Sequence, residues 1–175
     1  MPKIIENVKE LILDTSEKLL FQVGYKGFTI RGVAKRCGIA PGTIFNYFAS
    51  KEELITTIMA KDWENLLDDI KKESDLATDI AGGVSVIYKG IESFVQKYEL
   101  VCMDYPGNII SQFRKHHRSM HQQITDILNT LLTRLNREEE LSIISIFAET
   151  ILASSVQKDI DLPSLLKFTS RLFSS

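Results

Sequence analysis

The sequence has little cysteine and no long apolar run, and each shortage excludes a class of protein. Only Cys37 and Cys102 occur among 175 residues, far apart and at neither a metal nor a redox spacing, so a disulfide framework is not expected. No apolar stretch approaches the length of a membrane span, and the charged opening MPKIIENVKE lacks a signal-peptide pattern. The sequence therefore predicts a protein without a membrane partner that acts in a bacterial-type cytoplasm.

Recognisable catalytic motifs are missing as well. There is no glycine-rich phosphate loop, no nucleophile elbow and no pair of carboxylates with a histidine partner. A small helical enzyme would have to rely on His116, His117 or His121 without recognisable helpers. We therefore predict a protein that is not an enzyme and that needs no cofactor.

The net charge of −2 hides an asymmetry along the chain. Residues 1–51 carry eight Lys or Arg against four Asp or Glu, a net charge of +4, whereas the remainder carries 13 against 19, a net charge of −6. A basic beginning joined to an acidic body is typical of a protein whose first part meets a polyanion. A chance excess of basic side chains on a solvated surface explains the charge equally well.

Helical periodicity runs through the chain, and no stretch alternates like a hairpin strand. Gly24 is expected to end the first helix, Thr29 to cap the second and Gly38 to end it. Pro41 suits the first turn of a third helix. The S-x-x-E pattern at residues 50–53 predicts a capping box for a fourth helix, residues 51–73. Further helices are predicted over residues 84–103, 109–135, 138–157 and 163–173, with interruptions at Gly82-Gly83 and DYPGN and a candidate break near HHRS.

Two short helices separated by a turn that contains Gly38 predict a helix-turn-helix. Six apolar residues form its expected core: Ile30, Val33, Ala34, Ile39, Ile44 and Phe48. If Ile44 and Phe48 point inward, the residues between them face partly outward. An Asn amide can bond an adenine edge, and Thr or aromatic side chains can contact a thymine methyl group. Tyr47 and Lys51 can reach phosphates, Lys51 together with the free N–H groups that open the fourth helix.

The stretch FTIRGVAKRCGIAPGTIFNYFASKEEL, residues 28–54, resembles the DNA-binding domain of the TetR family of bacterial transcriptional regulators. The resemblance lies in Thr29, the VAKRCGI helix and turn, the recognition segment GTIFNYF and the SKEEL that opens the fourth helix. Phe45 is a departure, because the family often has Tyr there and Phe cannot donate a hydrogen bond to a phosphate.

The resemblance implies an all-α protein with an N-terminal three-helix helix-turn-helix domain, residues 1–50, and a C-terminal helical effector-binding and dimerisation domain, residues 51–175. It implies a ligand-responsive transcriptional regulator, most simply a repressor. Such a protein binds a near-palindromic double-stranded DNA operator as a homodimer and is released by a small-molecule effector. The DNA contacts that it implies are Thr29, Arg31, Pro41, Gly42, Thr43, Phe45, Asn46, Tyr47 and Lys51.

The segment LSIISIFAETILASSV, residues 141–156, is apolar on nearly every face and must be buried on all sides. A second apolar stripe follows in residues 162–173, and the two helices can form a four-helix interface about a two-fold axis. The expected interface residues are Ile143, Ile144, Phe147, Ile151, Leu165, Phe168 and Leu172. A core helix within one chain is the alternative, and we favour the interface.

Aromatic, methionine and histidine side chains in residues 55–135 are candidates for an effector pocket: Trp63, Tyr88, Phe94, Tyr98, Met103, Phe113 and His117. Each of the apolar ones also suits an ordinary core position. His117 and His121 are four residues apart and can share a metal on one helix, but no third ligand follows and the neighbouring Arg and Lys disfavour a cation. We therefore predict a solvated basic face and no metal site there. A binding module that has lost its DNA-binding activity remains a further alternative.

Overall fold

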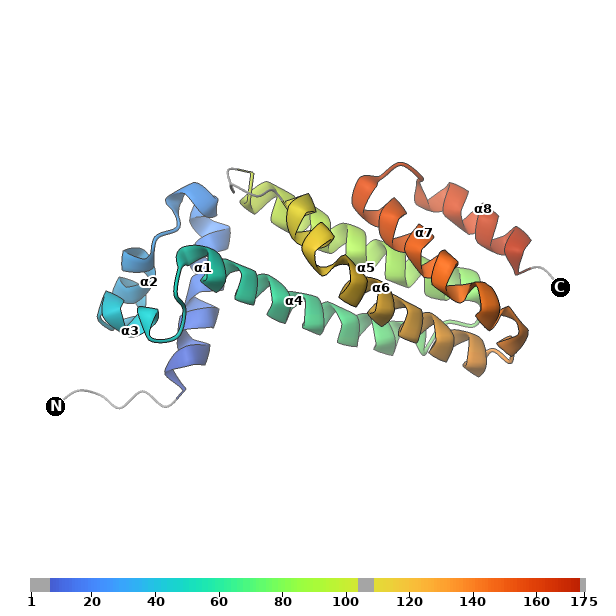
Figure 1. Ribbon diagram of the computed structural model, residues 1–175, viewed down its shortest axis with the longest axis horizontal. Helices are drawn as coiled ribbons and strands as arrows, with labels where there is room; N and C mark the ends of the chain where they lie inside the picture. The colour runs from blue at the N-terminus through green and yellow to red at the C-terminus, as the bar shows by residue number, and fades with distance from the viewer. Residues whose placement is uncertain (1–6, 104–108, 174–175) are drawn as a thin grey trace. The chain divides into compact units, whose positions relative to one another are not determined.

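A computed structural model of the protein describes residues 7–103 and 109–173, and within these ranges it contains helices and no strands. This confirms the predicted all-α fold (Figure 1). The helices are α1 (Val8–Gly27), α2 (Ile30–Cys37), α3 (Pro41–Phe45), α4 (Lys51–Ser74), α5 (Ile80–Val101), α6 (Ile109–Arg134), the short 3₁₀ helix η1 (Glu138–Ile143), α7 (Ile144–Gln157) and α8 (Leu162–Leu172).

Local capping signals determine where the N-terminal helices begin and end. The Thr29 hydroxyl accepts a hydrogen bond from the Gly32 N–H at 3.0 Å and begins α2. Gly38 ends α2 in the left-handed conformation, with φ 68°. A reciprocal capping box opens α4, in which the Glu53 N–H donates to the Ser50 hydroxyl at 3.0 Å and the Glu53 carboxylate accepts from the Ala49 N–H at 2.6 Å. These three sequence predictions are confirmed.

Three helix boundaries differ from the predictions. Gly24 has φ 66° and kinks α1, but one further turn follows it to Gly27. Gly82 and Gly83 do not interrupt a helix. They lie in the first turn of α5, where the Asp79 carboxylate accepts from the Gly82 N–H at 2.7 Å. The helix α6 also continues without a break through residues 116–119.

The described residues divide into two compact units. Unit 1 contains residues 7–64 and 99–103, and unit 2 contains residues 65–98 and 109–173. The division falls inside α4, between Glu64 and Asn65. The sequence-based boundary at residue 50 stays a prediction.

Unit 1 packs α2 and α3 beside α1 and the first turns of α4 (Figure 1). Its core consists of apolar side chains from all four helices and the segments between them: Ile12, Leu19, Leu20, Phe28, Val33, Ala34, Ile44, Phe48, Leu54, Ile55 and Ile58. Lys61 of α4 pairs with Glu10 at 3.0 Å and Asp14 at 3.1 Å on α1. Since all three side chains are about half exposed, these pairs contribute little to stability.

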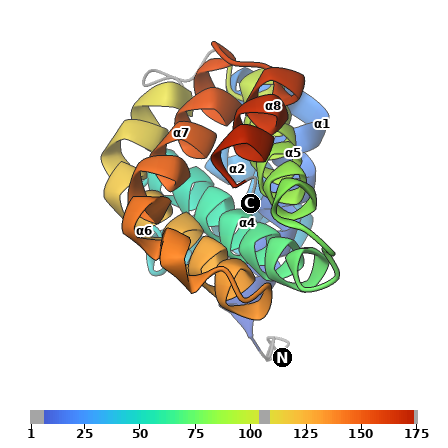
Figure 2. The same ribbon diagram turned by 90° about the vertical axis from the view of Figure 1, so that its right-hand side faces the viewer.

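Unit 2 consists of α5, α6, α7 and α8 running alongside one another, with the end of α4 (Figure 2). Its fully or almost fully buried residues include Val84, Ile87, Ile91, Ile124, Leu128, Leu132, Phe147, Ile151 and Leu165. The helices α5 and α6 approach closely at Gly83, where an added Cβ would lie 2.3 Å from Cδ2 of Leu131. A larger residue there would require the Leu131 side chain to move. Among the described residues, no helix is long and apolar enough to cross a lipid bilayer.

Candidate nucleic-acid interface

Two buried side chains anchor the α3 segment, residues 41–48, to unit 1. Ile44 is fully buried and Phe48 is 2% exposed, and Val33 and Ala34 of α2 are buried with them. The backbone N–H groups of residues 47 and 48 both donate to the carbonyl of Ile44, at 2.9 and 3.0 Å, so the turn continues past the end of α3. Four of the six predicted core residues are thus buried. The other two, Ile30 and Ile39, are half-buried because they lie at the edge of this small core.

The residues between the two anchors point to solvent. Phe45 is 53% exposed, Tyr47 is 42% exposed, and Asn46 is exposed as well. Large aromatic side chains are costly to leave in water, so a pair of them beside an amide marks a surface suited to a partner. Pro41 and Gly42 are exposed at the start of α3, Thr43 is half-buried, and an added Cβ at Gly42 would meet nothing within 4 Å. The structure therefore brings six predicted DNA contacts onto one short segment.

Thr29 and Arg31 are exposed at the beginning of α2. The hydroxyl of Thr29 already caps this helix, which leaves its second lone pair and its proton for other partners. Later in α2 the Arg36 guanidinium donates to the Gln22 side-chain oxygen at 2.7 Å, so α1 holds this cation. Of these two arginines, Arg31 is the stronger candidate for a phosphate contact.

Lys51 has a different environment from the other predicted contacts. Its Nζ donates to the backbone carbonyl of Tyr25 at 2.6 Å and lies 3.7 Å from the centroid of the Tyr25 ring. The neighbouring Glu52 carboxylate accepts from the Tyr25 hydroxyl at 2.8 Å. The sequence reasoning did not single out Tyr25, although an aromatic residue directly after the kink at Gly24 was a signal that could have marked it.

The part of the chain that forms this surface also matches the sequence model of a protein family. Residues 12–58, which include α2, α3 and the start of α4, match the sequence model for bacterial regulatory proteins of the tetR family. This segment belongs to the TetR family. The family resemblance read from residues 28–54 is therefore confirmed.

Several known proteins are similar to this chain. The uncharacterized HTH-type transcriptional regulator YhgD of Bacillus subtilis (strain 168) is 39% identical over 69 residues, 39% of this chain and 34% of that protein. The fatty acid metabolism regulator protein of the same strain is 25% identical over 131 residues, 71% of this chain and 62% of that protein. The chain thus spans between about a third and two thirds of the length of these two relatives. A crystal structure of a TerR/AcrR-family transcriptional regulator from Aquifex aeolicus VF5 is 21% identical, with a TM-score of 0.48 over 93% of this chain and 95% of that one.

The predicted effector residues of this chain are divided between the two units. Tyr88, Phe94 and Tyr98 are buried in unit 2, whereas Trp63 is buried in unit 1. Met103 also belongs to unit 1 and is 80% exposed. The side chain of Phe113 lies outside the described residues. The buried members of this set lie in the cores of their units.

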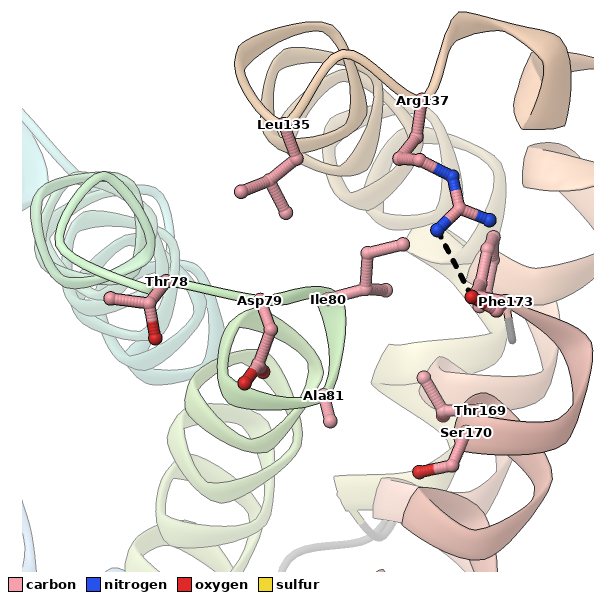
Figure 3. A pocket seen from close by; sticks show the side chains of 9 residues that line it. All are labelled: Thr78, Asp79, Ile80, Ala81, Leu135, Arg137, Thr169, Ser170 and Phe173. Carbon is pink, nitrogen blue, oxygen red and sulfur yellow. Dashed lines mark hydrogen bonds between the residues drawn. The ribbon is translucent and has the colours of Figure 1, made fainter. Parts of the chain in front are cut away.

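A hollow of about 350 Å³ lies elsewhere in unit 2 (Figure 3). Figure 3 shows the start of α5 on one side and the end of α8 on the other, with Arg137 above them. The lining combines polar and apolar side chains: Thr78, Asp79, Ile80, Ala81, Leu135, Arg137, Thr169, Ser170 and Phe173. The Arg137 guanidinium donates to the Phe173 carbonyl at 3.0 Å and pairs with Glu139 at 3.0 Å. None of these residues was predicted, because no local motif marks side chains that three separate segments bring together.

The two histidines of RKHHRSMH tie α6 to α7 within unit 2. His117 Nε2 lies 3.0 Å from the Glu149 carboxylate, and His121 Nε2 lies 2.9 Å from the Ser145 carbonyl. Among the residues described, no three His, Cys, Asp or Glu side chains are placed to hold a metal together. Both imidazoles therefore have protein partners on the neighbouring helix, and His117 is no part of the hollow in Figure 3.

The predicted interface residues on α7 and α8 divide into two groups. Ile144, Phe147, Ile151 and Leu165 are each at most 4% exposed within the single chain. They form intramolecular core, as the alternative interpretation held, because α7 is covered by α6 and α8. Ile143 and Leu172 are half-buried, and Phe168 is 48% exposed. Ile146 of α7, which was not predicted, is 74% exposed.

Proposed function

We propose that this chain is a ligand-responsive transcriptional repressor that acts in the bacterial cytoplasm and binds a near-palindromic DNA operator as a homodimer. One observation carries the proposal: Phe45, Asn46 and Tyr47 project into solvent from a turn whose neighbours Ile44 and Phe48 are sealed in the core. A rigidly held, exposed aromatic and amide surface suits insertion into a major groove.

The chemistry of this surface fits base and backbone recognition. An Asn46 amide can both donate to and accept from an adenine edge, and the ring of Phe45 can contact a thymine methyl group. Hydroxyls of Tyr47 and Thr43 suit phosphate oxygens, and exposed Arg31 at the beginning of α2 adds a positive charge to unit 1. The net charge of +4 over residues 1–51 favours approach to a polyanion.

Selection from a random DNA pool tests this proposal. Purified protein is incubated with random duplexes at physiological salt, and bound molecules are amplified and sequenced over several rounds. We expect enrichment of one sequence with two symmetric half-sites, because a homodimer offers the recognition segment twice. Recovery of random sequence after repeated rounds would contradict the proposal.

The homodimer is proposed to form through the outward faces of α7 and α8, which lie side by side in unit 2 (Figures 1 and 2). The exposed or half-buried apolar residues of these helices include Ile146, Leu166, Phe168 and Leu172, and half-buried Ile143 directly precedes α7. A two-fold axis beside such a face would pair it with itself. This replaces the buried residues in the sequence-based interface and keeps its two helices.

The effector is proposed to be a small molecule with both polar and apolar groups. The hollow of about 350 Å³ is of a size that suits such ligands, and its lining mixes Arg137 and Asp79 with Ile80 and Phe173. If an effector favours a conformation that binds the operator weakly, then the operator must weaken effector binding to the same degree. A thermal-shift screen of small molecules against wild type and Ser170→Trp tests the location. Compounds that bind here will stabilise the wild type and not the variant whose hollow is filled.

A further inference from the structure

The first two residues of α4 hold one residue at the end of α1. The Lys51 ammonium donates to the backbone carbonyl of Tyr25 at 2.6 Å and lies over the ring of the same residue, 3.7 Å from its centroid. The Tyr25 hydroxyl donates to the Glu52 carboxylate at 2.8 Å. Three separate groups of Tyr25, its carbonyl, its ring and its hydroxyl, are thus engaged by two consecutive residues.

These contacts close the chain around the helix-turn-helix. Tyr25 lies near the end of α1, before α2, and Lys51 begins α4, after α3, so α2 and α3 lie within a loop whose two ends are joined. The kink at Gly24, with φ 66° and ψ 175°, redirects the chain just before the joined residue. Phe28 is fully buried inside this loop, and its ring centroid lies 5.9 Å from Lys51 Nζ. A single connection at this point restrains both helices together.

The pKa shifts of Lys51 and Glu52 agree with side chains that are fixed in place by these contacts. Desolvation lowers the pKa of Lys51, which is half-buried, whereas an ammonium that is extended into solvent would not be desolvated. The hydrogen bond from Tyr25 lowers the pKa of Glu52. An ammonium that donates to a carbonyl and lies over an aromatic ring already has two favourable interactions, which a phosphate contact would have to replace.

We propose that Tyr25, Lys51 and Glu52 form a clasp that fixes the α3 segment for DNA binding, and that Lys51 is a positioning residue rather than a phosphate contact. The proposal rests on the proposed DNA-binding function and assigns to Lys51 a role different from the one that the family resemblance implied. In the bound state the ammonium stays on Tyr25, and phosphate contacts come from side chains of α2 and α3.

The salt dependence of DNA affinity separates the two roles of Lys51. Operator affinity is measured between low and physiological salt for wild type, Lys51→Met, Tyr25→Leu and the double variant, with Tyr25→Phe as the matched control that keeps the ring and the carbonyl. A lysine that neutralises one phosphate contributes about one unit to the slope of log affinity against log salt. A lysine in the clasp contributes to affinity without changing this slope.

We expect Lys51→Met and Tyr25→Leu each to weaken operator binding about tenfold, with the salt slope of wild type. In the double variant the two losses are expected to combine to less than their product, because both changes remove the contact of the ammonium with the Tyr25 ring. Tyr25→Phe should keep most of the affinity. A slope lowered by about one unit in Lys51→Met, losses that multiply in the double variant, or full affinity in Lys51→Met would each overturn the clasp.

Hydrogen exchange of the free protein tests the clasp without DNA. Amides of residues 30–45 should exchange faster in Lys51→Met and Tyr25→Leu by a similar factor, while amides of unit 2 keep their wild-type rates, which shows that both variants remain folded. Unchanged exchange in residues 30–45 would overturn the clasp. Failure of the wild type to prefer any DNA sequence would instead count against the proposed function, and the exchange result would still decide whether the clasp exists.

Discussion

The rings of Phe147 and Phe168 lie 6.3 Å apart, centroid to centroid, yet Phe147 is 2% exposed and Phe168 is 48% exposed. The edge of the unit 2 core therefore runs between these two rings. Phe147 is covered by the same chain, and Phe168 continues the apolar surface outward. An apolar ring placed at such an edge is well suited to continue into the core of a second subunit.

The variant Phe168→Asp is expected to separate the proposed dimer without unfolding the chain. A charge on the outward face would be buried without a partner in the assembled dimer, whereas in a monomer it stays in water. Light scattering coupled to gel filtration should show a dimer for wild type and a monomer for Phe168→Asp and Ile146→Asp. As a control, Phe147→Ala should instead lower the free energy of unfolding by about 3–5 kcal/mol, because it leaves a cavity. Dimers that persist in both Asp variants would contradict the proposed interface.

Two glycines provide a matched pair of alanine substitutions. In Gly83→Ala the new methyl group would lie 2.3 Å from Leu131 Cδ2, so overpacking of about 1–3 kcal/mol should exceed the gain in helix propensity of about 1 kcal/mol. In Gly42→Ala the methyl group meets nothing within 4 Å, and stability should be unchanged or slightly higher. Urea unfolding measures both effects. If DNA lies against the start of α3, Gly42→Ala should also weaken operator binding, which a purely structural role of Gly42 would not produce.

The sequence predicted the features of this fold that are encoded locally. Thr29, Gly38 and the Ser50–Glu53 pair act on groups within four residues of themselves, so their patterns were sufficient to place helix ends. The exposure of residues 45–47 was likewise predictable, because it follows from helical spacing once Ile44 and Phe48 are known to be buried.

The features that the sequence did not predict depend on contacts between distant segments. The interruption expected at Gly83 is a close approach of two helices, which only the position of Leu131 explains. From the sequence, burial of Phe147 within one chain could not be distinguished from burial in a dimer. An apolar helix must be covered, but its sequence does not specify whether the same chain or a second subunit covers it. The contact of Lys51 with Tyr25 joins residues 26 positions apart. The charge of Lys51 and its place at the start of α4 were equally consistent with a phosphate contact.

The free energy of unfolding is expected to depend on pH through the Glu52 carboxylate. The hydrogen bond from Tyr25 holds the pKa of Glu52 below its ordinary value of 4.5 in the folded protein. A carboxylate with a lowered folded-state pKa stabilises the protein above pH 4.5, and this contribution is lost as the pH falls through the folded-state value. Wild type should therefore be more stable than Glu52→Gln at pH 7, and the difference in free energy of unfolding should shrink below pH 4.5. A constant difference across this range would show that the ionised carboxylate plays no part.

The base preferences of Asn46→Ala test whether the exposed α3 segment recognises DNA bases. Wild type and variant are each used to select sequences from the same random duplex pool. The account predicts that both enrich the same symmetric site, but that the variant loses its preference at one base pair of each half-site, at a cost of about 1–3 kcal/mol in discrimination there. Identical preferences at every position of the site for the two proteins would contradict it.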